Sequence, residues 1–228
     1  MDQFTKQLLD EVGDLEPHVG LPQGFCLGLL KDDDWSFVIK IHALIETSLT
    51  RLLCAIVEPE PLKELIVTLD VSGGRFSKVT LLKHLNAIQG HEVKAIREIS
   101  KIRNRFVHNI KYVGFDLTRY IADLPLPERD EFARNTLAFA FDEDPPKAER
   151  DKAISEPKTH LWRCGLFLTA LSKMRTDNRR LEAQFETQES EHSIIEKENL
   201  LREKLLLERE LAALRHFVET ITKPSAPS

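Results

Sequence analysis

Cysteine, tyrosine and tryptophan are scarce in this chain of 228 residues, which contains three, two and two of them. Cys26, Cys54 and Cys164 are odd in number, lie far apart and form neither a C-x-x-C pattern nor a Cys/His metal spacing. We therefore expect free thiols in the core of a protein from a reducing compartment, rather than disulfides or a zinc site. The sequence predicts no metal site and no cofactor.

A long hydrophobic run is also missing, because no stretch of about 18 residues is free of charge. The first residues, MDQFTKQLLDEVGDL, are charged and amphipathic, without the apolar region of a signal peptide. These two absences predict a cytoplasmic protein that makes no contact with a membrane.

Positive charge is not in excess either, since the formal net charge is -5 and the pI is about 5.9. This balance argues against a protein that coats nucleic acid by its overall charge. A contact with RNA or DNA would have to come from a local basic patch.

Apolar residues recur at helical spacing, and no segment shows the alternation of a β-strand. The clearest helix covers 35–57, where nine apolar side chains share one broad face. Residues 141–151, FDEDPPKAERD, are predicted to form an exposed loop. The fold class is all-α, a helical bundle, and further helices are expected at 2–16, 62–69, 77–88, 92–110, 117–122, 128–139 and from 159.

The composition changes after Thr176, and the chain up to Ile221 is rich in Glu, Arg, Leu and Lys without Gly or Pro. This segment predicts a long helix that pairs with a second copy as a coiled coil, or that folds back along its own bundle. Its seam runs first through Leu181, Phe185, His192, Ile195 and Asn199, and then, after a shift of frame, through Leu200, Lys204, Leu207, Leu211, Leu214, Val218 and Ile221. The predicted organisation is thus a helix and loop at 1–29, a bundle at 30–175, a coiled coil at 176–221 and a disordered tail at 222–228.

The segment KIRNRFVHN, residues 101–109, places an arginine among apolar residues. On a helical wheel Arg103 falls inside the apolar arc, whereas Arg97, Asn104 and His108 cluster on the neighbouring polar edge. Arg103 and His108 are about 140° apart, so their side chains diverge within one helix. Bringing them to one ligand requires a second subunit or a long side chain at a helix end.

An unpaired charge in a core costs several kcal/mol, so Arg103 needs an acidic partner or a polar cleft. The candidate partner is Glu46, which stacks four residues after His42 at the edge of the apolar arc of 35–57. Either a buried Glu46–Arg103 pair fixes the register of two helices, or Arg103 faces a cleft.

The motif R-N-x-x-x-H, formed by Arg103, Asn104 and His108 at a helix end, resembles the motif of the HEPN superfamily. More narrowly, SFVIKIHALIETSLTRLL, FSKVTLLKHLNAI and ISKIRNRFVHN resemble, in order and style, the mannitol operon repressor family. The resemblance covers about residues 30–175. It implies a helical bundle that forms a homodimer, through the bundle as well as the coiled coil, with two motifs facing each other across a cleft.

In catalytic members of the superfamily, the arginine and histidine cleave RNA without a metal and leave a 2′,3′-cyclic phosphate and a 5′-hydroxyl. The resemblance therefore assigns Arg103 and His108 to catalysis, with Asn104 orienting them or the substrate. An imidazole can exchange a proton near neutral pH, and a guanidinium can stabilise charge on phosphate oxygens. Nearby cations at Arg97, Lys101 and Arg105 are the predicted contacts to the RNA backbone.

Two functions follow from this resemblance. The first is a metal-independent endoribonuclease of the toxin or defence type, which could have an antitoxin as partner. The second is a non-catalytic module of the mannitol operon repressor type, which acts in transcriptional regulation through a regulatory protein; a purely structural adaptor is a third reading. Direct DNA reading has little support, because no helix-turn-helix and no strongly basic helix are present.

Overall fold

The computed structural model describes residues 15–17, 19–57, 60–107, 110–138, 140–141, 144–185, 202 and 205. Throughout these ranges the regular elements are helices, which confirms the all-α fold class. The chain divides into two units, 1–179 and 180–228, and the packed core belongs to the first. Across the described ranges, no helix is both long and apolar enough to cross a membrane.

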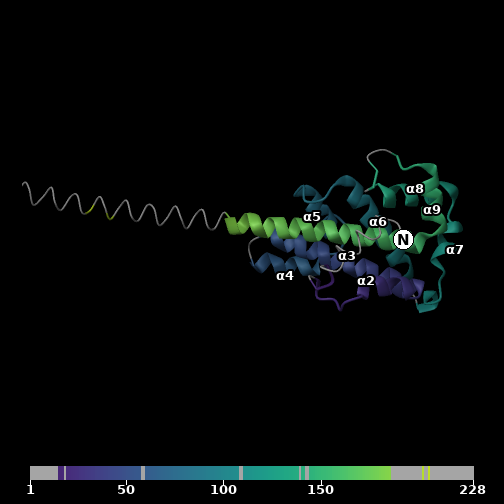
Figure 1. Ribbon diagram of the computed structural model, residues 1–228, viewed down its shortest axis with the longest axis horizontal. Helices are drawn as coiled ribbons and strands as arrows, with labels where there is room; N and C mark the ends of the chain where they lie inside the picture. The colour runs from purple at the N-terminus through teal and green to yellow at the C-terminus, as the bar shows by residue number, and fades with distance from the viewer. Residues whose placement is uncertain are drawn as a thin grey trace, which may run out of the picture. The chain divides into compact units, whose positions relative to one another are not determined.

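The helices of the first unit follow one another with short connections (Figure 1). The last of them continues without a break from 157 to 185, so it extends into the second unit. We call it helix 157–185. The elements before it are α2 (Phe25–Gly28), the 3₁₀ helix η1 (Leu29–Lys31), α3 (Asp34–Ile56), α4 (Glu60–Thr68), α5 (Lys78–His84), α6 (Gly90–Val107), the 3₁₀ helix η2 (Ile110–Tyr112), α7 (Leu117–Ala122), α8 (Leu126–Leu137) and α9 (Lys147–Ser155).

The helix α3 forms the centre of the bundle. It begins where the Asp33 side chain accepts a hydrogen bond of 3.0 Å from the backbone N–H of Ser36, as an N-cap residue does. It ends at Ile56, before Pro59 and Pro61 in the sequence. Most of its predicted apolar face is buried, which confirms the periodicity: Phe37, Val38, Ile41, Leu44, Ile45, Leu49, Leu52 and Leu53.

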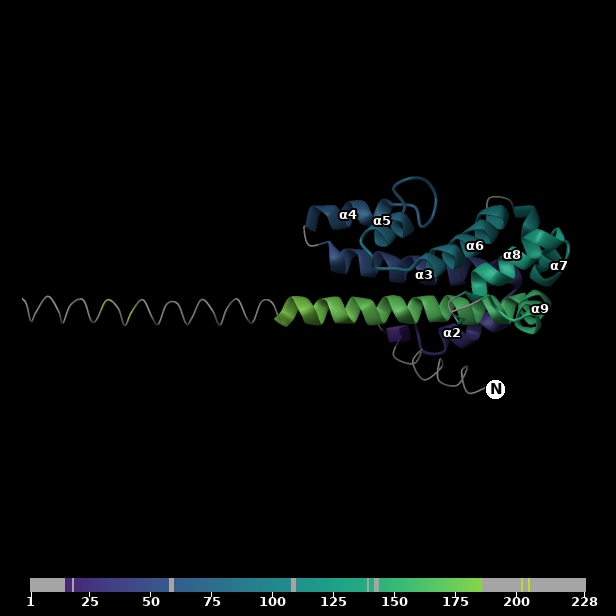
Figure 2. The same ribbon diagram turned by 90° about the horizontal axis from the view of Figure 1, so that it is seen from above.

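Two other long helices pack against α3. Lys158 Nζ lies 3.1 Å from Asp34 Oδ1, so α3 and helix 157–185 begin side by side. The helix α6 runs in the opposite direction, because its end meets the start of α3, where Trp35 Nε1 donates to the carbonyl of Phe106 at 3.3 Å. In both views α4 and α5 lie beside the last part of α3, and α7, α8 and α9 gather at the opposite end of the bundle (Figures 1 and 2).

Helix 157–185 approaches α3 closely at Gly165. A Cβ atom added there would lie 2.5 Å from Cγ1 of Ile41, a fully buried side chain of α3. Only glycine therefore lets helix 157–185 pack this closely against α3.

One sequence-based prediction is wrong in this part of the chain, because α9 occupies part of the segment predicted as a loop. The helix begins after Pro146 and carries Glu149 in its first turn and Lys152 in its last. Both charges favour a helix by their interaction with its dipole. The segment is mostly charged, however, so it lacks the apolar periodicity by which a helix is recognised in a sequence. The short helix α2 was not predicted either.

None of the three cysteines, which all lie in the described ranges, forms a disulfide, and Cys26 and Cys164 are buried in the core, as predicted. Burial, together with the nearby carboxylate of Glu16, raises the pKa of the Cys26 thiol to about 12. This thiol therefore stays protonated and unreactive at neutral pH.

Candidate functional site

The predicted motif lies in the last turns of α6, where this helix meets the start of α3. Arg103 is half-buried, and its Nη1 donates a hydrogen bond of 2.9 Å to Oδ1 of the exposed Asn104. The structure thus joins two of the three motif residues directly. His108 lies outside the described residues, so its position relative to Arg103 stays a prediction.

Arg103 does not pair with Glu46, so the predicted Glu46–Arg103 ion pair is wrong. Glu46 Oε1 instead accepts a hydrogen bond of 2.8 Å from Nζ of Lys78, at the start of α5. The side chain of Lys78 is 2% exposed and that of Glu46 is 38% exposed. The carboxylate therefore compensates a buried ammonium group, and within the described ranges no carboxylate forms an ion pair with Arg103.

His42 occupies the interface between α3 and α6. Its Nε2 lies 3.2 Å from Oγ of Ser100, which is within hydrogen-bonding distance, and both residues are buried. Burial, and next the positive charge of Arg103, lower the pKa of His42. The nearby carboxylates of Glu46 and Asp70 act in the opposite direction but do not reverse the shift. His42 is therefore neutral at pH 7, and it adds no charge beside Arg103.

These contacts form a polar seam between α3, α5 and α6, which we define by Lys78, Glu46, His42, Ser100 and Arg103. Its inner end is closed, because the ammonium group of Lys78 is matched by a carboxylate. Its outer end is more open, because the half-buried Arg103 bonds the exposed Asn104. The seam thus leaves a guanidinium group at the surface of the bundle.

The three cations predicted to contact RNA, Arg97, Lys101 and Arg105, are all exposed on α6. Lys94 is exposed on the same face, and intervals of three or four residues separate these four side chains. We call them the basic face; it extends along the helix for about 16 Å, at 1.5 Å per residue. At its end the guanidinium of Arg105 lies 5.2 Å from the ring centre of Tyr120.

Three members of this region were not predicted from the sequence. Ser100 falls between an isoleucine and a lysine, next to the apolar arc of α6. Lys78 directly follows the N-cap residue Ser77, and nothing in its local sequence indicates burial. Lys94 could have been found by extending the spacing of Arg97 and Lys101 by one turn.

Comparisons with protein-family models, curated proteins and solved structures find no match to this chain. The resemblance to the HEPN superfamily therefore remains a prediction from the sequence motif.

Proposed function

We propose that this protein is a metal-independent endoribonuclease, and that it cleaves RNA at a composite site formed by Arg103, Asn104 and His108 of two subunits. The observation that carries this proposal is the state of Arg103. Glu46, the acidic partner expected for it, is bound to Lys78, and Arg103 instead bonds Asn104 at a helix end. A purely structural arginine would be expected to pair with a carboxylate in the bundle.

The chemistry assigned to each residue follows from its side chain. The 2′-hydroxyl of one nucleotide attacks the adjacent phosphorus, so a new P–O bond forms and the bond to the 5′-oxygen breaks. A histidine accepts the proton of the 2′-hydroxyl, and a second one donates a proton to the leaving 5′-oxygen. Two copies of His108 can supply both roles, while Arg103 stabilises the charge that develops on the phosphate oxygens.

The basic face supports an RNA substrate. Its four cations are exposed and follow one line of α6, on the side of Asn104 and on the opposite side of the helix from Arg103, although the chain as a whole is acidic. A polyanionic strand bound there would lie along the helix and pass Asn104, the motif residue to which Arg103 donates a hydrogen bond. The substrate is therefore held by local charge, as the overall composition requires.

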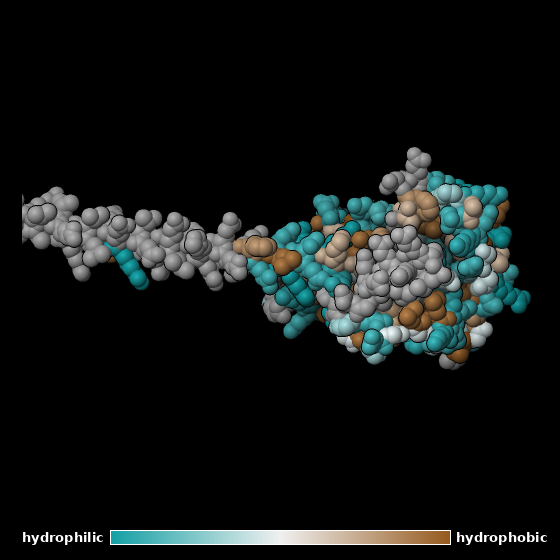
Figure 3. All heavy atoms as spheres, in the orientation of Figure 1, coloured by the Kyte–Doolittle hydropathy of each residue, from teal (hydrophilic) through white to brown (hydrophobic). Residues whose placement is uncertain are grey.

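Dimerisation is part of the proposal, because Arg103 and His108 diverge on a single helix. In the second unit, Leu181 and Phe185 are exposed and lie four residues apart on one helix face. Figure 3 shows hydrophobic side chains where the described part of this helix ends. These side chains belong to the apolar positions predicted to form the coiled coil, and their exposure supports pairing of two such helices.

A second candidate function rests on a different surface. Leu62, Leu65 and Val67 of α4 are exposed, and so is Phe76 in the connection to α5. Leu62 and Leu65 share one face of α4, and exposed apolar side chains on one helix face are typical of a protein-docking surface. It favours the alternative of a non-catalytic interaction module that acts in transcriptional regulation.

The test incubates the purified full-length protein with a mixed single-stranded RNA pool in the presence of EDTA. We expect fragments with 2′,3′-cyclic phosphate and 5′-hydroxyl ends. Arg103→Ala and His108→Ala should each slow cleavage by at least about a hundredfold, the usual effect of losing an electrostatic or acid–base group. Arg119→Ala is the matched control, because Arg119 is an exposed arginine of α7 whose side chain is 83% accessible.

Circular dichroism spectra of all variants must match that of the wild type, so that a loss of cleavage is not caused by a loss of folded structure. Intact RNA after incubation with the wild-type dimer would contradict the nuclease and favour the interaction module. Equal cleavage by the wild type and Arg103→Ala would exclude the proposed site.

A further inference from the structure

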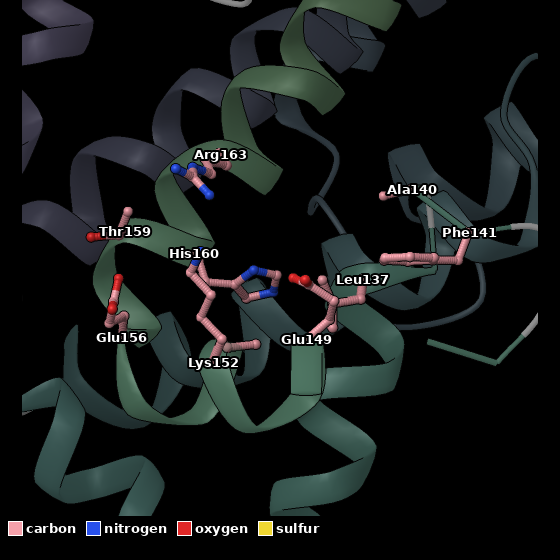
Figure 4. Close-up of a pocket in the computed structure, with 10 residues that line it drawn as sticks. Leu137, Ala140, Phe141, Glu149, Lys152, Glu156, Thr159, His160 and Arg163 are labelled. Carbon is pink, nitrogen blue, oxygen red and sulfur yellow. The ribbon is translucent and has the colours of Figure 1, made fainter. Parts of the chain in front are cut away.

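A hollow of about 160 Å³ opens between the end of α8, the connection that follows it, α9 and the first turns of helix 157–185 (Figure 4). Its apolar lining comes from Leu137, Ala140, Phe141 and Ala153. A protein cavity of roughly 150 Å³ is large enough to hold benzene, so this hollow can hold one aromatic ring.

Two small side chains, those of Ala140 and Ala153, line the hollow and leave space in it. The local core between α8 and α9 consists of Ala133, Leu137 and Ala153, with Phe141 packed against it. Two of its three buried members are alanines, where a globular core usually has larger side chains. A leucine at either Ala140 or Ala153 would project additional atoms into the hollow.

One polar ring lies among these apolar groups. Figure 4 shows the imidazole of His160 extending from the start of helix 157–185 into the space between the lining side chains. Its Nε2 lies 2.7 Å from Oγ1 of the fully buried Thr136. This contact fixes one edge of the ring and leaves the other edge for a ligand.

The protonation state of the ring follows from the hydrogen bonds of Thr136. Its hydroxyl donates its single proton to the carbonyl of Phe132, at 2.7 Å. With the hydroxyl assigned in this way, Oγ1 accepts from Nε2 of His160, and in the corresponding tautomer the imidazole has a lone pair on Nδ1. No described residue donates a hydrogen bond to this Nδ1 atom.

Burial, and next the positive charge of Arg163, lower the pKa of His160 to about 4. The ring is therefore neutral at pH 7, and Nδ1 is a hydrogen-bond acceptor. Around the opening, the carboxylates of Glu149 and Glu156 balance the positive charges of Lys152 and Arg163. The described lining residues thus carry no net formal charge, which favours a ligand without net charge.

We propose that this hollow binds a neutral, single-ring aromatic molecule that donates one N–H or O–H hydrogen bond to Nδ1 of His160. The ring would contact Leu137, Phe141 and Ala153, and the donor would satisfy the acceptor. This site involves neither Arg103 nor the basic face, so it is independent of the proposed ribonuclease activity.

The test uses phenol as the probe and anisole, its methyl ether, as the matched compound without a donor. Binding to the full-length protein at pH 7 is measured by saturation-transfer NMR as a function of ligand concentration. We expect saturable binding of phenol and a dissociation constant for anisole that is roughly three- to tenfold larger, the effect of one hydrogen bond.

Three variants locate the site. Ala140→Leu should abolish binding of both compounds, because it fills the hollow from an exposed position that tolerates a larger side chain. Ala148→Leu should bind like the wild type, because Ala148 is exposed on α9 and does not line the hollow. His160→Phe should still bind both compounds but lose the preference for phenol, because it keeps an aromatic ring and removes the acceptor.

The proposal is overturned if the wild type shows no saturable binding of phenol. It is also overturned if Ala140→Leu binds phenol as well as the wild type does, since the ligand would then occupy another place. A preference for phenol that persists in His160→Phe would exclude Nδ1 as the acceptor, and with it the proposed class of ligand.

Discussion

Replacing Glu46 by glutamine removes the carboxylate that faces the buried ammonium group of Lys78. In the folded protein Nζ of Lys78 can still donate to the amide oxygen of the glutamine and, at 3.4 Å, to the carbonyl of Val67, but the buried ammonium group loses its charged partner. Its side chain is 2% exposed, so water cannot replace the lost partner without a rearrangement of the bundle. The reverse change, Lys78→Met, leaves a carboxylate that is 38% exposed and can be hydrated.

The size of each effect follows from this asymmetry. A hydrogen bond between charged groups contributes about 1.5–3 kcal/mol, and the partial exposure of Glu46 reduces this value by screening. We therefore expect a coupling free energy of about 1–2 kcal/mol between Glu46 and Lys78. Glu46→Gln alone should cost about 1–3 kcal/mol, whereas Lys78→Met should cost below about 1 kcal/mol, because methionine can occupy the apolar site without a charge.

The assay is a pair of double-mutant cycles in urea unfolding, followed by far-UV circular dichroism. One cycle combines Glu46→Gln with Lys78→Met, and the other combines Glu46→Gln with Arg103→Met. The second coupling should be below about 0.5 kcal/mol, because the structure contains no Glu46–Arg103 contact. A larger coupling of Glu46 to Arg103 than to Lys78 would refute this assignment and remove the main support for a functional Arg103.

Two further predictions concern stability. Gly165→Ala should lower the free energy of unfolding by about 1–3 kcal/mol, because the new Cβ would overlap Ile41, whereas Gly114→Ala, with no heavy atom within 4 Å of its Cβ position, should have little effect in the same urea assay. His160 binds its proton less readily in the folded state, with a pKa of about 4 against 6.5, so the protein should lose stability as the pH falls from about 6.5 to 4. His160→Phe should reduce this loss of unfolding free energy by up to about 3 kcal/mol, as measured by urea unfolding at several pH values. If the unfolding free energies of both proteins depended on pH in the same way, the shifted pKa would be contradicted.

The long helices were predictable because each buries a regular apolar face. The apolar positions of 35–57 indicated α3 with nearly correct ends, and those of 117–122 indicated α7 with its observed bounds. The helix α9 escaped notice because it is short and mostly charged, and few of its side chains enter the core. Periodicity detects the helices that bury a regular apolar face, and it misses a short, charged helix such as α9, of which only Ala153 is buried.

The candidate site divides in the same way. The exposure of Arg97, Lys101 and Arg105 could be predicted, because it depends on positions around one helix. The ion-pair partner of Glu46 could not be predicted, because several cations from other helices are candidates. Which of them lies nearest to Glu46 depends on how the helices pack. Lys78 reaches Glu46 from α5, 32 residues further along the chain.

The sequence by itself thus determined the all-α class, the polar and apolar sides of α3 and α6, and the motif that suggests RNA cleavage. These properties follow from the order of residues along single helices. Only the tertiary structure decided that Lys78 takes Glu46, that Arg103 remains with Asn104 at the surface, and that two alanines leave a hollow beside His160. Pairing between helices and the space left among them depend on how separate segments pack in three dimensions, and a local pattern contains no record of that packing.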